Sequence, residues 1–130
     1  MDFFLTVHQY LRFVILAVGL LGVLRTLVSL GTREATFMRV DHLLLRLYTG
    51  ALDLQFVVGV VLVFLLLSAA QTVPWIHLVI MLPAIFVVHL SRRYREWPNR
   101  ERLGVHLRIY LGSLVLIGIG LLVIGQLRLM

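Results

Sequence analysis

The sequence predicts an all-α, polytopic membrane protein: one bundle of four transmembrane helices with both termini on the outer, non-cytoplasmic side. The 130 residues are 61% hydrophobic and 14% charged, and the mean hydropathy is +1.01. A soluble domain of this length cannot bury so much apolar surface, so lipid is the expected solvent. The apolar residues also form four runs of membrane-spanning length, and the arginines gather beside two of the three connecting loops.

The four apolar runs leave space for a single domain over residues 1–130, because each span takes about 20 residues. The predicted spans are about 3–28, 42–68, 73–91 and 103–127. Pro74 suits the first turn of the third helix, where a missing N–H costs nothing. Between the third and fourth spans lies the clearly hydrophilic segment 91–102.

The orientation is predicted from the arginines, because cytoplasmic loops carry the excess of basic residues. The first and third loops are flanked by arginines, whereas the middle loop has none. The flanking residues are Arg25, Arg33, Arg39 and Arg46 for the first loop, and Arg92, Arg93, Arg95, Arg100, Arg102 and Arg108 for the third. We therefore expect the first and third loops in the cytoplasm and both termini outside.

The composition also excludes several function classes. The chain has no cysteine, so it cannot use a thiol nucleophile, iron–sulfur ligation or covalent c-type haem attachment. Its net charge of +6 comes from arginines that flank the spans, which favours lipid over nucleic acid as the partner. The sequence contains no catalytic motif. Whether the protein is an enzyme is left open, and the enzymatic role that fits the sequence is that of an electron-transfer component.

Apart from His42, at the start of the second predicted span, four histidines lie within the spans, in two layers. His8 and His77 belong to the outer layer, and His89 and His106 to the inner layer. Each layer has one imidazole from each of two helices, an arrangement suited to six-coordinate haem iron. The sequence therefore predicts one or two haem b groups, although histidines near the interface also bond backbone or water.

A polar stripe marks one face of the second span. His42, Arg46, Thr49 and Asp53 follow one another at helical spacing. We expect this stripe to face the bundle interior, either as a buried structural network or as a site for a propionate, a proton or a quinone headgroup. In the first span, Arg12 is expected either to pair with Asp53 or to bind a haem propionate.

Three short motifs carry a resemblance to a known family. The first span begins with His8-Gln9-Tyr10-Leu11-Arg12-Phe13, the second holds Tyr48-Thr49-Gly50-Ala51-Leu52-Asp53-Leu54-Gln55 followed by Gly59, and the third holds His77 and His89. This pattern resembles small bacterial four-helix membrane proteins described as cytochrome-b-like. The resemblance implies b-type haem and membrane electron transfer, with His8, His77 and His89 as site residues. The family has an acidic residue directly before the third-span histidine, where this chain has Ile76.

Two functions from different classes are compatible with these features. The first is a haem b protein that carries electrons within or across the bilayer, with a quinone as a further ligand. The alternative is a cofactor-free accessory subunit of a larger respiratory or photosynthetic complex, packed against other membrane subunits or against copies of itself. The fourth span favours such packing, because its glycines let helices approach closely: Gly104, Gly112, Gly118, Gly120 and Gly125.

Overall fold

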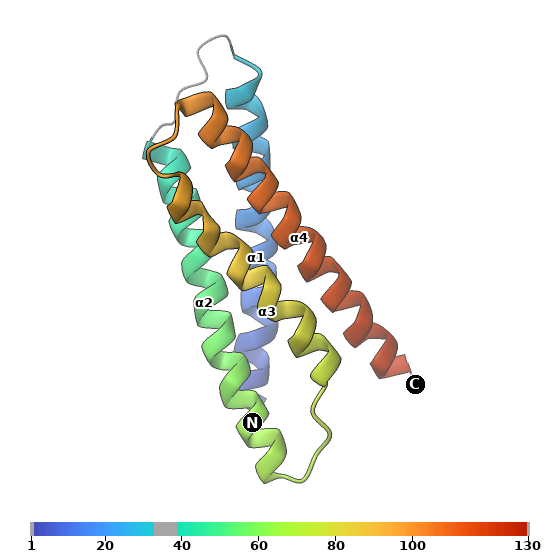
Figure 1. The fold of residues 1–130 in the computed structure, drawn as a ribbon. Helices are drawn as coiled ribbons and strands as arrows, with labels where there is room; N and C mark the ends of the chain where they lie inside the picture. The colour runs from blue at the N-terminus through green and yellow to red at the C-terminus, as the bar shows by residue number, and fades with distance from the viewer. Residues whose placement is uncertain (1, 33–38, 130) are drawn as a thin grey trace.

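The protein is a bundle of four long helices joined by short connections (Figure 1). A computed structural model describes residues 2–32 and 39–129. Its elements are α1 (Asp2–Leu30), α2 (Arg39–Ser68), α3 (Trp75–His89), the short 3₁₀ helix η1 (Leu90–Tyr94) and α4 (Asn99–Leu129). Four stretches are long and apolar enough to cross a membrane, η1 extending the third of them. The predicted all-α class and the four spanning helices are therefore confirmed, and no strand occurs in the described ranges.

The helix ends differ from the predicted spans by a few residues. α2 and α4 begin earlier, at Arg39 and Asn99, because polar first turns can extend beyond the apolar core into the headgroup region. Pro74 precedes α3 and occupies its N-cap, one position before the predicted first turn. Arg33, one of the arginines used to orient the chain, lies outside the described residues.

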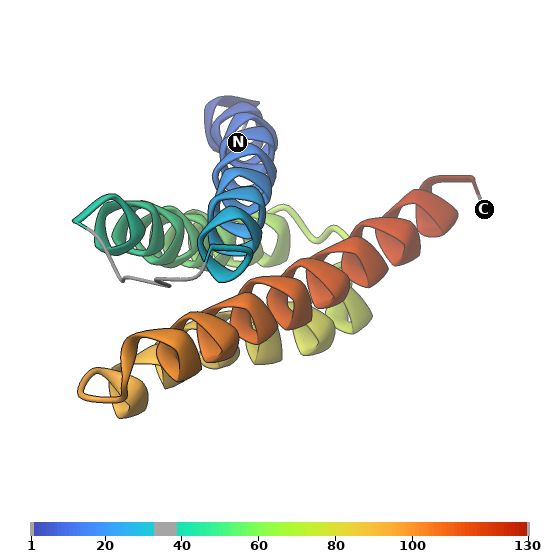
Figure 2. The same cartoon turned by 90° about the horizontal axis from the view of Figure 1, so that it is seen from above.

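The helices pack as two pairs, α1 with α2 and α3 with α4, and α4 also packs along α1. α2 and α3 make far fewer contacts with each other, and Figure 2 shows them on different sides of the bundle axis. The seam between α2 and α3 is therefore the least tightly packed part of the fold. Both internal cavities described below open along this seam.

A buried tyrosine cluster joins the two helix pairs near the middle of the bundle. The hydroxyl groups of Tyr48 and Ser113 lie 2.6 Å apart in a hydrogen bond between α2 and α4. The rings of Tyr48 and Tyr110 are 5.2 Å apart, and Tyr48, Tyr110 and Ser113 are almost fully buried. α1 comes close to this cluster because Gly22 has no side chain: a Cβ there would overlap the ring of Tyr110.

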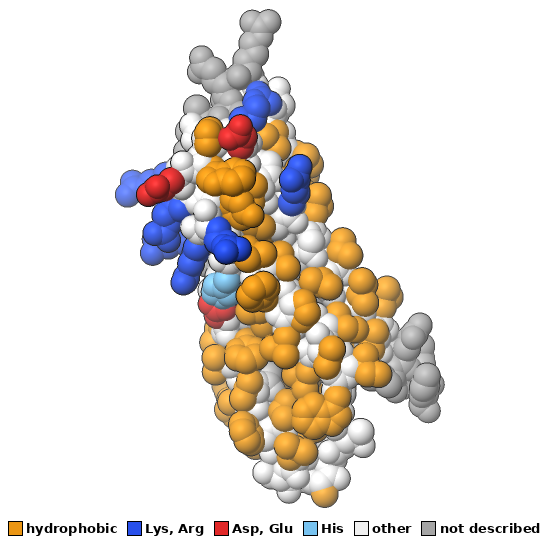
Figure 3. Space-filling view, viewed as in Figure 1, with side chains coloured by type: hydrophobic (Ala, Val, Ile, Leu, Met, Phe, Trp, Pro, Cys, Tyr) orange, Lys and Arg blue, Asp and Glu red, His pale blue; other side chains and the backbone are white. Residues whose placement is uncertain are grey.

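The two ends of the bundle have different surfaces. On the visible face, the arginines gather at the end that holds the α1–α2 and η1–α4 connections, whereas the rest of that face is largely apolar (Figure 3). Arg25 of α1 lies 3.4 Å from the carboxylate of Asp41 in α2. Arg100 of α4 donates to the backbone carbonyls of Leu30 and Thr32, at the end of α1. These contacts hold the two connections together at the arginine-rich end.

The close approach of α1 to α4 gives a test of this packing. Gly22→Ala should lower the free energy of unfolding by roughly 1–3 kcal/mol, because the added Cβ overlaps a buried tyrosine ring. Gly118→Ala is the matched control, since nothing lies within 4 Å of the Cβ position at Gly118. Denaturation with sodium dodecyl sulfate in mixed micelles measures both variants. Equal stabilities for the two would show that α1 and α4 are not packed in this way.

Candidate functional site

Two cavities lie along the α2–α3 seam, one in each half of the bundle. The outer cavity is lined by residues that include His8 and His77, and the inner cavity by residues that include His89 and His106. The structure therefore brings together the same two histidine pairs that the sequence placed in two layers. Whether either pair binds haem stays a prediction.

The outer cavity has a volume of about 500 Å³ and a mainly apolar wall. This volume lies within the range of about 300–1,000 Å³ that is usual for ligand and cofactor sites. All four helices contribute to it. Its apolar lining includes Ile15, Leu52, Phe56, Val60, Leu78, Met81, Ile85, Ile117 and Leu121, and its polar lining includes His8, Gln9, Arg12, Gln55 and His77.

His77 is held in one orientation by the backbone of α4. Its Nδ1 atom lies 3.1 Å from the carbonyl oxygen of Gly120. A carbonyl can only accept, so Nδ1 must carry a proton, and in the neutral imidazole Nε2 then keeps its lone pair. This is the usual arrangement of a metal-binding histidine, in which the second nitrogen donates to a carbonyl or carboxylate. Ile76 cannot supply that acceptor, and the carbonyl of Gly120 does so instead.

The helices lie close together beside this contact. A Cβ at Gly120 would lie 3.0 Å from the terminal methyl group of Met81 and 3.5 Å from Nδ1 of His77. The first distance is tight, so the flexible Met81 side chain would have to shift, whereas the second is an ordinary van der Waals contact. The glycine thus leaves space for Met81 next to the carbonyl oxygen that His77 contacts.

His8 lies on the face of α1 that meets α2, where its ring is 3.7 Å from the Cβ position of Gly59. Its Nδ1 atom is buried and has no hydrogen-bond partner among the described residues. The backbone carbonyl of His8 accepts a hydrogen bond of 2.8 Å from Nε2 of Gln55, whose Oε1 atom is also buried without a described partner. A buried polar atom without a partner costs about 1–3 kcal/mol. Two such atoms belong to residues that line this cavity, so they are candidates for contact with a polar group there.

The donor set fits a porphyrin better than a bare metal ion. No group of three or more potential metal ligands occurs among the described residues. Two imidazoles from different helices match haem iron, because the macrocycle supplies the remaining four donors. Arg12 lines the same cavity and is the cation available to a propionate. Its guanidinium carbon lies 4.8 Å from the ring centroid of Phe13.

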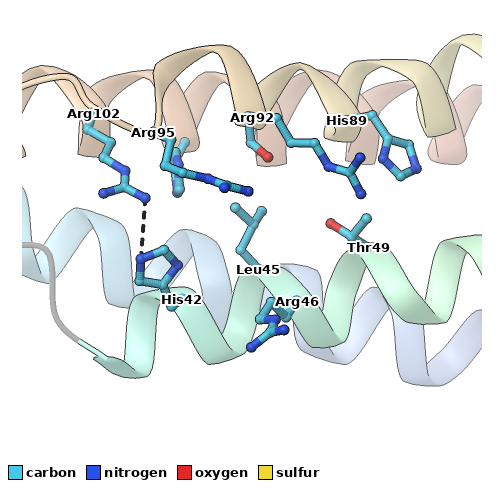
Figure 4. Close-up of a pocket in the computed structure, with 10 residues that line it drawn as sticks. His42, Leu45, Arg46, Thr49, His89, Arg92, Arg95 and Arg102 are labelled. Atoms are coloured by element: carbon cyan, nitrogen blue, oxygen red, sulfur yellow. Dashed lines mark hydrogen bonds between the residues drawn. The ribbon is translucent and has the colours of Figure 1, made fainter.

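The inner cavity, of about 520 Å³, is polar and is shown in Figure 4. His89 lines it, and its Nε2 atom lies 2.9 Å from a carboxylate oxygen of Asp53. His106 also lines it and is buried. His42, at the exposed end of the cavity, accepts a hydrogen bond of 3.3 Å from Arg102. Because Nε2 of His89 already bonds to Asp53 of α2, a haem ligated through Nε2 would have to displace Asp53, and only Nδ1 of His89 is left as a donor while that contact is kept.

The polar stripe of α2 lies along the seam. His42, Arg46 and Thr49 line the inner cavity, and Asp53 contacts a residue that lines it. The predicted pairing of Arg12 with Asp53 is not what the structure shows. Asp53 pairs with His89, whereas Arg12 lines the outer cavity. Residue spacing predicts the depth of a residue along its helix but not the rotation of the helices, which decides which polar groups meet.

Several contributors to these sites were not identified from the sequence. The carbonyl of Gly120 is a backbone group, so residue type gives no signal for its role. Arg92 and Arg95 counted only as evidence of orientation, yet their side chains line the inner cavity. Tyr48 appeared only within a resemblance motif, and its bond to Ser113 joins residues 65 positions apart.

Comparison of the chain with family models, curated proteins and solved structures finds no match. The resemblance to cytochrome-b-like proteins is therefore carried by the quoted motifs alone.

The pairing of Asp53 with His89 can be tested by a double-mutant cycle on the free energy of unfolding. Asp53→Asn and His89→Gln should show a coupling energy of about 1 kcal/mol, as expected for a hydrogen bond with a charged partner within a membrane protein. The cycle of Asp53→Asn with Arg12→Gln should give a coupling energy near zero. A larger coupling for the Arg12 cycle would contradict the observed pairing.

Proposed function

We propose that the protein is a haem b-binding membrane protein that carries electrons, with His8 and His77 as the two axial ligands in the outer cavity. The observation that supports this most strongly is the hydrogen bond from Nδ1 of His77 to the carbonyl of Gly120, which leaves Nε2 as a lone-pair donor. The partnerless Nδ1 atom of His8, in the same cavity, gives independent support.

Each residue has a defined task in this proposal. When bound, haem b supplies a one-electron couple between ferric and ferrous iron. His8 and His77 hold the iron from two helices, and the carbonyl of Gly120 fixes the rotation of the His77 ring. The apolar wall excludes water, and Arg12 binds a propionate and adds positive charge near the macrocycle. A quinone, soluble in the bilayer, is a suitable electron donor or acceptor for such a site.

The proposal includes an orientation in a bacterial inner membrane. The arginines cluster at the end with the α1–α2 and η1–α4 connections, which would then face the cytoplasm by the positive-inside rule. The N-terminus, the α2–α3 turn and the C-terminus would face outward. The outer cavity would thus lie closer to the outward-facing side, and electron exchange there would involve a partner in the outer leaflet or beyond it.

We propose a single haem for each chain. The inner pair, His89 and His106, also shares a cavity, but Asp53 already binds His89. Breaking the contact between His89 and Asp53 would leave the Asp53 carboxylate without its partner beside a second haem. The inner site is therefore the weaker candidate for haem.

Substitution of the histidines tests the ligand assignment. His8→Ala or His77→Ala should remove the haem or make it high-spin, because each change removes one axial ligand. His42→Ala, His89→Ala and His106→Ala should keep the low-spin spectrum and the haem content. The Soret band and the pyridine haemochrome assay measure both quantities in purified protein. Loss of haem in the His89 and His106 variants, with retention in the His8 and His77 variants, would refute the assignment.

Substitution of Arg12 tests the position of the positive charge. Arg12→Gln should keep the low-spin spectrum but lower the midpoint potential by tens of millivolts, because a nearby cation favours the reduced, less positive iron. Arg108→Gln serves as the control, since Arg108 is an exposed residue that does not line the outer cavity. Potentiometric titration compares the variants. An unchanged potential in Arg12→Gln would place Arg12 away from the haem.

One observation favours the second function, that of a subunit packed against another membrane protein or another copy. Gly104, Gly118 and Gly125 have open space at their Cβ positions, so they serve no packing within the described chain. Their separations of 14 and 7 residues place them on one face of α4. Small residues on one face permit close helix contact. Extraction in a mild detergent should then give a complex of fixed stoichiometry, and a monomer alone would exclude this function.

A further inference from the structure

The inner cavity gathers positive charge at the arginine-rich end of the bundle. Its ten lining residues include four arginines and no aspartate or glutamate. The arginines are Arg46, Arg92, Arg95 and Arg102, and they come from α2, from η1 and its C-terminal flank, and from α4. Charges of the same sign repel one another in so small a volume. An anionic ligand in the cavity would remove this repulsion.

The arginine side chains are arranged around a common space. Arg92 and Arg95 extend along the α3 side of the cavity, opposite Leu45 and Thr49 of α2 (Figure 4). Arg102 lies at one end, where it donates to His42. Leu45 and His106 are buried, whereas Arg92 and Arg95 are exposed, so the site is a pocket with a buried floor and a cationic rim. The hydroxyl groups of Thr49 and Ser91 add hydrogen-bond donors to the lining.

The carboxylate of Asp53 does not balance the positive charge of this cavity. It lies 2.9 Å from Nε2 of the lining residue His89, and its single negative charge stands against four arginines. No ion pair within 4.0 Å joins Arg46, Arg92 or Arg95 to another residue of the described ranges. Guanidinium groups bind phosphate oxygens through two parallel hydrogen bonds, and this geometry makes arginine the preferred residue for phosphate recognition. Several guanidiniums with two hydroxyl groups form a suitable lining for a tetrahedral oxyanion.

We propose that the inner cavity binds a phosphate group, carried either by the headgroup of an anionic phospholipid or by a soluble phosphate. The position of the cavity suits a lipid headgroup, because it lies where the apolar parts of α2 and α4 give way to their arginine-bearing ends. This site is separate from the outer cavity, and the proposal does not depend on haem.

The test uses the whole chain in nanodiscs of phosphatidylcholine with a titrated fraction of phosphatidylglycerol. Native mass spectrometry counts the phosphatidylglycerol molecules retained by each protein. The variant is Arg92→Gln with Arg95→Gln. Its matched control is Arg93→Gln with Arg108→Gln, which removes the same charge from two exposed arginines that do not line the cavity. A parallel arm measures binding of inorganic phosphate in nanodiscs of phosphatidylcholine alone.

We expect one tightly retained phosphatidylglycerol, or one bound phosphate, in the wild type and in the control. The affinity should fall about a hundredfold in the cavity variant, as expected for the loss of two charge-assisted hydrogen bonds. Retention of lipid without phosphate binding identifies a lipid headgroup as the ligand. Phosphate binding without lipid retention identifies a soluble phosphate.

Three results would overturn the proposal: no selective binding of either ligand to the wild type, an equal loss in the cavity variant and the control, or a second haem that the cavity variant alone loses. Size-exclusion chromatography and helical circular dichroism establish that each variant is folded. If the double variant does not fold, Arg46→Gln tests the same cavity from α2, with a predicted loss of about tenfold. The lipid and phosphate assays do not use haem absorbance. Their results can therefore be interpreted even if the protein binds no haem.

Discussion

The hydrogen bond between Tyr48 and Ser113 is the contact on which the rest of the bundle depends. It joins α2 to α4, and the adjacent ring of Tyr110 packs into the space left by Gly22 of α1. In lipid, helices gain little by burying apolar surface against one another, so close packing and interhelical hydrogen bonds must hold them. This cluster supplies both, and its Tyr48 and Ser113 are fully buried, so neither hydroxyl group is exposed to water.

The same cluster lies close to the division between the two cavities. On α2, the inner cavity is lined as far as Thr49 and the outer cavity from Leu52, with Tyr48 buried on the packed face beside that division. On α4, Tyr110 and Ser113 lie between His106, in the inner lining, and Ile117, in the outer lining. Two sites of different character can therefore exist in one small bundle. The outer site is apolar with two imidazoles, and the inner site is cationic.

The sequence was sufficient for the class of fold, because the length of an apolar run determines whether a helix can cross a bilayer. It also placed His8 with His77 and His89 with His106, since depth along a helix follows from residue spacing. It did not predict which groups touch. The contact of Asp53 with His89, in place of Arg12, depends on helix rotation. The contact of His77 with Gly120 depends on how closely α3 approaches α4, and a backbone carbonyl gives no sequence signal.

The central claim is that His8 and His77 bind the iron of one haem b between α1 and α3. Electron paramagnetic resonance of the oxidised, purified wild-type protein, combined with iron analysis, tests it most directly. If His8 and His77 bind one haem, we predict about one iron per chain and the low-spin ferric signal of two imidazole ligands. A colourless protein without iron, purified from cells supplied with ample haem, or a wholly high-spin signal would contradict it.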